Sequence, residues 1–182
     1  MRLRGAEIAE ATGARVLVAG SSEPPTRAVI DSSAAGPGDL FFGLRGENRD
    51  GGEFAAAAIE AGAWGVVVGP DFAAALVEVT GSKPVTPTGL PWVFTADDPL
   101  AALQALATAN RRALGAKVLG VTGSVGKTSV KDIARTLLPG RVHANAQNFN
   151  TEIGLPLTVL EAPGETETLV LEMAMRGGGQ IA

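Results

Sequence analysis

The segment with the clearest chemical meaning runs from Gly120 to Ser129 and reads GVTGSVGKTS. Its glycines can adopt backbone angles that a side chain would block, so the amides between them can turn inward around a phosphate. Lys127 supplies a charge for the β- and γ-phosphates, and the Thr128 hydroxyl could hold Mg²⁺. We expect Lys127 to be catalytic. The predicted nucleotide-binding residues are Gly123, Ser124, Val125, Gly126, Lys127, Thr128 and Ser129.

This loop departs from the strict pattern G-x-x-x-x-G-K-[ST], because Val121 occupies the position of the first glycine. The core G-x-x-G-K-T is present, between a strand expected at 117–121 and a helix expected at 127–138. A glycine turn followed by a merely solvated lysine is the alternative interpretation. The strand–loop–helix context favours the phosphate loop.

A second candidate is Glu172, a carboxylate inside the apolar run LVLEM at 169–173. Burying a carboxylate is unfavourable unless it is paired or bound to a metal. If this strand runs parallel to the strand before the loop, it brings Glu172 to the same sheet edge as Thr128. Both could then bind Mg²⁺. A glutamate that faces solvent at a strand end is the other interpretation.

The third candidate is the polar run NFNTEIGLP at 148–156. Such a run beside glycine and proline is typical of a loop, although asparagine side chains can also position a substrate. Asn148 and Asn150 are the candidates for that role. The single histidine, His143, has no partner His or Cys nearby in sequence, so we interpret it as a surface or structural residue.

The elements that position these groups alternate between strand and helix, which is typical of an α/β fold with a doubly wound parallel sheet. The expected helices cover 5–12, 53–61, 71–79, 99–114 and 127–138. The expected strands cover 15–18, 28–30, 40–44, 64–68, 92–94, 117–121 and 169–173. The proline- and glycine-rich stretch 81–91 is the best linker candidate. We therefore expect a small N-terminal α/β domain at 1–94 and a phosphate-loop domain at 95–182.

Composition excludes several classes of function. The 182 residues carry a net charge of −4 and no cluster of Lys or Arg, so a nucleic-acid partner is not expected. The absence of cysteine excludes disulfides, thiolate zinc sites and cysteine nucleophiles. No apolar run approaches the ~20 residues that cross a bilayer, so we expect a cytoplasmic protein without membrane insertion. A monomer is the default expectation for its oligomeric state.

Taken together, these residues resemble the Mur ligase family of peptidoglycan synthesis, a part of cell wall biogenesis. The match TGSVGKTS at 122–129 is shared across that family and with folylpolyglutamate synthases. The stretch NFNTEIGLPLT at 148–158 resembles the MurF branch more specifically. The run LEM at 171–173, followed by RG at 176–177, resembles the strand whose glutamate binds Mg²⁺ in that branch.

The N-terminal part resembles more loosely the family's domain that holds a UDP-sugar. The matching pieces are DSS at 31–33, PGDLF at 37–41, Gly46, and Asp50 with Gly51. The resemblance makes Asp31 and Ser32 candidates for substrate binding. The family usually has arginine where this chain has Ser33, and often histidine where it has Gly52.

The resemblance implies a ligase that uses ATP and Mg²⁺. Such a ligase joins D-alanyl-D-alanine to UDP-N-acetylmuramoyl-tripeptide through an acyl-phosphate intermediate. It covers nearly the whole chain, but the chain corresponds to well under half of a Mur ligase. We therefore expect an N-terminal fragment, truncated within the phosphate-loop domain and inactive by itself. One alternative is a MurE-like or folylpolyglutamate-like amino-acid ligase, and another is a nucleotide-binding switch without ligase activity.

Overall fold

The computed structural model describes residues 1–81, 89–146 and 149–174. The chain separates into two compact units, Met1–Leu106 and Ala107–Ala182. This division falls inside helix α4 (Pro99–Leu114). The domain boundary between 94 and 95 stays a prediction, and positions 82–88 of the predicted linker lie outside the described residues.

The first unit is built on a mixed five-stranded sheet of order β1-β5-β4-β3-β2, in which β1 is antiparallel to β5 and the other pairs are parallel. The central strands β3 and β4 are buried at every position, so both faces of the sheet are covered. The strands are β1 (Arg15–Val18), β2 (Arg27–Val29), β3 (Asp39–Phe42), β4 (Gly65–Val68) and β5 (Trp92–Thr95). The helices are α1 (Gly5–Thr12), η1 (Ser32–Ala34), η2 (Gly51–Phe54), α2 (Ala55–Glu60) and α3 (Pro70–Gly81).

Two helices of this unit begin at other residues than expected: α2 begins at Ala55 instead of 53, and α3 begins one residue earlier than 71. The carboxylate of Asp50 accepts a hydrogen bond from the amide of Gly52 at 2.9 Å, so the 3₁₀ turn η2 precedes α2. Helix α3 begins at Pro70 rather than Asp71, because proline's fixed φ and missing N–H suit the first helical position. Strand β2 ends at Val29, one residue short of the predicted end, where its pairing with β3 stops.

The tryptophans form an aromatic stack in the first unit. The rings of Trp64 and Trp92 are 5.8 Å apart, and those of Trp92 and Phe94 are 5.3 Å apart. Each indole N–H donates to a main-chain carbonyl, that of Glu23 for Trp64 and that of Ser21 for Trp92. The polar atoms of the stack are thereby satisfied.

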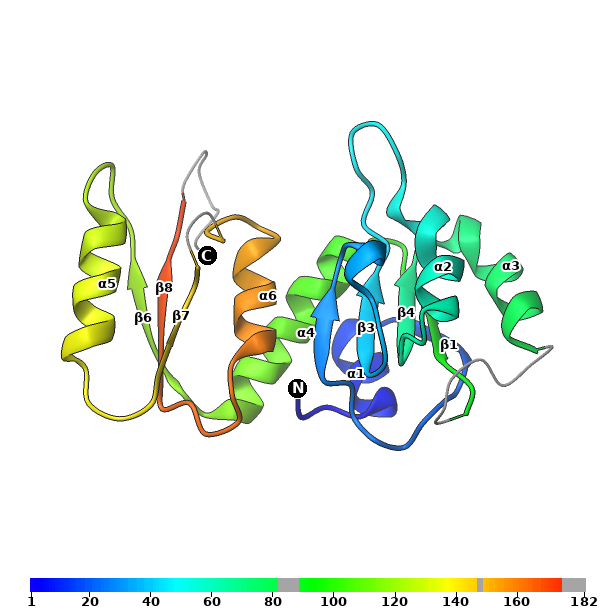
Figure 1. Ribbon diagram of the computed structural model, residues 1–182, viewed down its shortest axis with the longest axis horizontal. Coiled ribbons are helices and arrows are strands. Elements are labelled where there is room, and N and C mark those ends of the chain that lie inside the picture. The colour runs from blue at the N-terminus through cyan, green and yellow to red at the C-terminus, as the bar shows by residue number, and fades with distance from the viewer. Residues whose placement is uncertain (82–88, 147–148, 175–182) are drawn as a thin grey trace. The chain divides into compact units, whose positions relative to one another are not determined.

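The second unit has a parallel three-stranded sheet of order β6-β8-β7 (Figure 1). Its strands are β6 (Lys117–Val121), β7 (Val142–Ala144) and β8 (Thr168–Glu172). Helices α5 (Lys127–Leu137) and α6 (Gly154–Glu161) lie on opposite faces of this sheet. The register pairs Val121 with Glu172, so the end of β6 and the end of β8 meet at one sheet edge.

Strand β7 and helix α6 are absent from the elements expected from the sequence. Strand β7 has only three residues, which is too short for a clear apolar alternation. Helix α6 begins inside the polar run taken as a loop, and it carries Pro156 in its first turn. Proline is tolerated there because the N–H groups of a first turn have no partner within the helix.

Helix α5 buries its polar side rather than its apolar one. Lys131 is buried, whereas Val130, Ile133 and Leu137 are exposed in the described chain. The helix packs against β8 and β7. The face turned toward the strand ends is therefore the one that carries Thr128 and Lys131.

Candidate nucleotide site

The phosphate loop lies between the end of β6 at Val121 and the start of α5 at Lys127. Gly123 has φ 147° and Gly126, the N-cap of α5, has φ 79°. These left-handed angles are the ones that glycine adopts without steric penalty. The residues of the loop are exposed, so the amides ahead of the helix are accessible at the positive end of its dipole.

The side chain of Lys127 folds back over this loop. Its Nζ donates a hydrogen bond to the carbonyl oxygen of Gly123 at 2.7 Å. That contact holds the ammonium above the turn. Val125 is 90% exposed, so what it can offer a ligand in this loop is its main-chain amide.

Thr128 and Glu172 meet where the loop passes into the helix. The Thr128 hydroxyl donates to Oε2 of Glu172 at 2.9 Å, and the Asn150 amide donates to Oε1 at 3.1 Å. Glu172 is only 6% exposed, so it does not face solvent. Three predicted site residues from separate elements are thus brought together around one carboxylate.

Two further residues belong to this group and were not predicted from the sequence. Lys131 is 3% exposed, with Nζ 3.9 Å from Oε2 of Glu172 and 2.9 Å from the carbonyl oxygen of Asn145, to which it donates. Asn145 bonds the main chain of Glu172 with both ends of its side-chain amide. The available signal for Lys131 was positional. Lys131 lies one helical turn after Lys127 on a helix that the sequence predicts. Asn145 follows β7, which the sequence does not predict, so no signal pointed to it.

The other predicted substrate residues lie elsewhere. Asp31 caps η1 in the first unit, and Ser32 is the first residue of that turn. The hydroxyl of Ser33 donates to the Asp31 carboxylate at 2.7 Å, and the Ser33 amide donates at 2.9 Å. These two bonds, the hydroxyl's being the larger cause, hold the pKa of Asp31 below its ordinary value. Asn148 lies outside the described residues. His143 lies on β7 with Nε2 3.1 Å from the carbonyl oxygen of Thr158, which fits a structural role.

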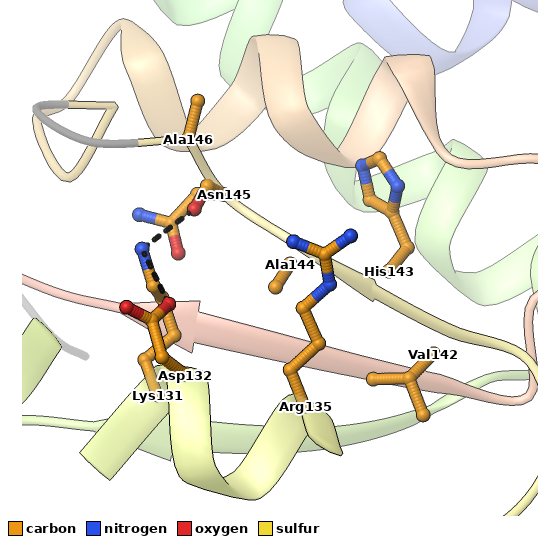
Figure 2. A pocket seen from close by; sticks show the side chains of 8 residues that line it. All are labelled: Lys131, Asp132, Arg135, Val142, His143, Ala144, Asn145 and Ala146. Atoms are coloured by element: carbon orange, nitrogen blue, oxygen red, sulfur yellow. Dashed lines mark hydrogen bonds and ion pairs between the residues drawn. The ribbon is translucent and has the colours of Figure 1, made fainter. Parts of the chain in front are cut away.

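A pocket of about 340 Å³ lies between α5 and β7 (Figure 2). Its lining shares Lys131 and Asn145 with the group around Glu172, so the pocket adjoins that group. Figure 2 shows the side chain of Arg135 extending along the pocket beside His143. The lining residues are Lys131, Asp132, Arg135, Val142, His143, Ala144, Asn145 and Ala146.

The donor set around Glu172 fits Mg²⁺ of the kind that accompanies a bound nucleotide. Mg²⁺ prefers oxygen ligands, and nucleotide sites usually supply one or two protein ligands while phosphates and water complete the shell. The Thr128 hydroxyl and the Glu172 carboxylate are such oxygens, already in contact with each other. Within the described ranges, no group of three His, Cys, Asp or Glu residues forms a metal cage of its own.

Comparison with protein-family models identifies both parts of the chain. The model described as Mur ligase family, catalytic domain, matches residues 26–117, and the Mur ligase middle domain matches residues 121–182. None of the helices in the described ranges combines the length and hydropathy needed to span a membrane.

Curated relatives of this chain carry the name UDP-N-acetylmuramoyl-tripeptide–D-alanyl-D-alanine ligase, and two of them illustrate the likeness. The protein from Bacillus subtilis is 46% identical over 144 residues, which are 78% of this chain and 29% of the relative. The protein from Mycobacterium tuberculosis is 40% identical over 199 residues, covering all of this chain and 38% of the relative. The chain thus spans about a third of the length of these relatives.

Solved structures give the same result. MurF from Acinetobacter baumannii matches with a TM-score of 0.74 and 25% identity, over 96% of this chain and 36% of that one. MurF ligase from Thermotoga maritima, solved in complex with ADP, matches with a TM-score of 0.67 and 31% identity, over 85% of this chain and 33% of that one. The predicted fold of an N-terminal α/β unit followed by part of a phosphate-loop unit is confirmed.

Proposed function

Because this chain belongs to the Mur ligase family, we propose that its full-length protein joins D-alanyl-D-alanine to UDP-N-acetylmuramoyl-tripeptide with ATP. The relatives in Bacillus subtilis and Mycobacterium tuberculosis carry the name of this activity. The observation that carries the proposal is the contact of Thr128 with Glu172 directly behind a glycine loop and a lysine. The reaction belongs to peptidoglycan precursor synthesis, in the cytoplasm.

In this proposal the loop binds the nucleotide through its main chain. The amides of Gly123, Ser124, Val125 and Gly126 surround the phosphates, and those of Thr128 and Ser129 add the helix N-terminus. Lys127 gives up its bond to the Gly123 carbonyl and turns its ammonium to the terminal phosphates. The likeness to a MurF ligase solved in complex with ADP supports nucleotide binding by this chain.

Mg²⁺ would be held by the Thr128 hydroxyl and the Glu172 carboxylate. When bound, the ion would neutralise charge on the phosphate oxygens. The carboxylate is already held by hydrogen bonds on both of its oxygens, which limits its reorientation. Asn150 donates to the same carboxylate and is a candidate for positioning the substrate. Asn148, the second candidate from the sequence, lies outside the described residues.

The substrate's UDP-sugar would bind to the first unit, through Asp31 and Ser32. The short helix η1 presents these residues at the surface, and the Asp31 carboxylate is ordered by Ser33. This assignment rests on the resemblance of residues 31–33 to the family's pattern. In that pattern, arginine usually stands where this chain has Ser33.

The chemistry would run in two steps. An oxygen of the tripeptide's terminal carboxylate attacks the γ-phosphorus, which breaks its bond to the bridging oxygen, forms an acyl phosphate and releases ADP. The amine of the dipeptide then attacks the acyl carbon, an amide bond forms, and phosphate leaves. The contribution of Lys127 and of the loop amides is positioning and charge stabilisation.

The experiment is an acceptor panel with the full-length protein, ATP and Mg²⁺, in which each acceptor is tested with UDP-N-acetylmuramoyl-tripeptide, with UDP-N-acetylmuramoyl-L-alanyl-D-glutamate and with a folate as the carboxylate substrate. ADP release should depend on D-alanyl-D-alanine and should not be supported by diaminopimelate, lysine or glutamate. Release that requires a single amino acid would contradict the proposal and favour a MurE-like or folylpolyglutamate-like ligase. Nucleotide binding with no acceptor-dependent turnover would favour a switch.

A further inference from the structure

We propose that Asn145 is a positioning residue for Glu172, which it holds in place by extending the sheet with its side-chain amide. The inference deepens the proposed function, since it takes Glu172 as a ligand of Mg²⁺. It concerns a residue that follows β7 and belongs neither to the phosphate loop nor to the polar run at 148–156.

The side-chain amide of Asn145 takes the place that the main chain of a neighbouring strand residue would have in the sheet. Pairing of β7 with β8 ends at Ala144 and Val170, so the main chain of Glu172 has no strand partner on the β7 side. The Asn145 amide occupies that place. Its Oδ1 accepts from the Glu172 N–H at 2.8 Å, and its Nδ2 donates to the Glu172 carbonyl at 3.0 Å.

On the opposite side, strand β6 holds the same stretch of β8. Val121 is the register partner of Glu172, and its carbonyl accepts from the amide of Met173 at 2.9 Å. The end of β8 is therefore bonded on both sides, by a strand on one and by Asn145 on the other. This fixes the main chain from which the Glu172 carboxylate projects toward Thr128.

The same amide also fixes the segment that returns toward the carboxylate. Nδ2 of Asn145 donates a second hydrogen bond, to the carbonyl of Phe149 at 3.0 Å. The next residue, Asn150, donates to Oε1 of Glu172, and its carbonyl accepts from Ala174 at 3.0 Å. One side chain thus ties together the end of β7, the end of β8 and the Asn150 contact.

The chemistry of this position is narrow. Asn145 is 3% exposed, so a lost bond is not replaced by bulk water. The position needs one acceptor and two donor hydrogens at asparagine length, and aspartate offers acceptors only. In an Asn145→Asp variant, a carboxylate oxygen would face the carbonyls of both Glu172 and Phe149. The Glu172 main chain would lose the hydrogen bonds that hold it, while the Glu172 side chain itself would be chemically unchanged.

The test measures metal affinity as well as turnover. Mn²⁺ is titrated into the full-length protein with the non-hydrolysable analogue AMP-PNP, and free Mn²⁺ is read by electron paramagnetic resonance. Loss of a contact that orients a metal ligand typically weakens metal binding by 10- to 100-fold, so Asn145→Asp should weaken Mn²⁺ binding by about 10-fold or more. Glu172→Gln is measured alongside as the direct loss of the ligand.

Asn110→Asp is the matched control. Asn110 is also 3% exposed, and its Nδ2 donates to the carbonyl of Val159 at 3.1 Å, away from Glu172. The control should lower thermal stability and leave Mn²⁺ affinity unchanged. If Asn145→Asp does not fold, Asn145→Ser, which removes the amide without adding a charge, is judged by the same criterion.

The outcomes separate the two proposals. Failure of the unaltered protein to bind Mn²⁺ with the nucleotide, or no effect of Glu172→Gln, overturns the magnesium assignment and this inference with it. If Glu172→Gln weakens binding but the Asn145 variants bind Mn²⁺ as tightly as Asn110→Asp does, only the role of Asn145 is overturned. If the Asn145 variants bind Mn²⁺ more weakly and Asn110→Asp does not, the role of Asn145 is supported.

Discussion

The Thr128 hydroxyl donates a 2.9 Å hydrogen bond to the carboxylate of Glu172, 44 residues further along the chain. The bond joins the first turn of α5 to the last residue of β8. It forms because β6 and β8 are parallel and pair Val121 with Glu172. The helix that follows β6 therefore starts beside the end of β8. The predictions below test what this junction and the first unit do.

Glu172→Gln should raise the Mg²⁺ requirement of the full-length protein, because a neutral amide replaces the carboxylate that would face the ion. The Mg²⁺ concentration that gives half-maximal ADP release should rise about 10-fold or more. Even the loss of a residue that only orients a metal ligand typically weakens metal binding by about that factor. An Mg²⁺ titration of ADP release measures it. Glu161→Gln, an exposed change at the end of α6, is the control. An unaltered Mg²⁺ titration would remove Glu172 from the site.

Lys127→Ala should reduce kcat/KM for ATP by about 100-fold or more, since it deletes the charge that would face the terminal phosphates. Far-ultraviolet circular dichroism should stay unchanged, because among the residues that the structure describes the Lys127 ammonium bonds only a loop carbonyl at the surface. Lys117→Ala removes an exposed lysine from the start of β6 and should leave turnover intact. Equal turnover in Lys127→Ala and the unaltered protein would exclude the catalytic role.

Gly43→Ala should lower the free energy of unfolding by about 1–3 kcal/mol, the usual effect of overpacking. A Cβ at Gly43 would lie 2.8 Å from the main chain of Gly52, and one at Gly52 would overlap the ring of Phe72. Crowding by the Phe72 ring thus disfavours a side chain at position 52. Gly69→Ala is the control, since a Cβ there meets nothing within 4 Å. Urea unfolding measures both, and equal stabilities would refute the crowding argument.

Ser33→Ala should raise the pKa of Asp31 toward its ordinary value, because the hydroxyl of Ser33 is the main cause of the lowering and its amide the second. A lowered pKa in the folded state means that these bonds stabilise the fold above the ordinary pKa and are lost as pH falls through the folded one. Carboxyl carbon NMR shifts between about pH 2 and 6 measure it. Ser32→Ala keeps both bonds and should leave the pKa of Asp31 unchanged.

The phosphate loop could be predicted from the sequence because it is local. Three features depend only on neighbours in the chain: the glycine backbone angles, the start of the helix, and the position of Lys127 beside Thr128. The structure has the positive φ angles at Gly123 and Gly126 and begins α5 at Lys127, as expected. The cap of α4 is equally local. Asp98, directly before the first residue of the helix, accepts from the amides of Leu100 and Ala101, and Asp is among the residues preferred as a helix N-cap.

Helix α5 marks the limit of such arguments. Its residues Val130, Ile133 and Leu137 have the spacing of a core face, yet they are exposed in the described chain, and Lys131 is buried. Periodicity gives the orientation of side chains relative to each other but not which face packs on the sheet. The short β7 and the proline-bearing α6 were missed because their stability comes from packing, not from propensity.

The sequence by itself determined the strand–loop–helix that presents Lys127 and Thr128, the alternating α/β order, and the family pattern around Glu172. Only the tertiary structure decided which side chains hold Glu172. Lys131 lies 3.9 Å from its carboxylate and Asn145 bonds its main chain, because of the register of β7, β8 and β6 and the packing of α5. Such contacts depend on how distant strands align, a relation that local propensity and spacing do not encode.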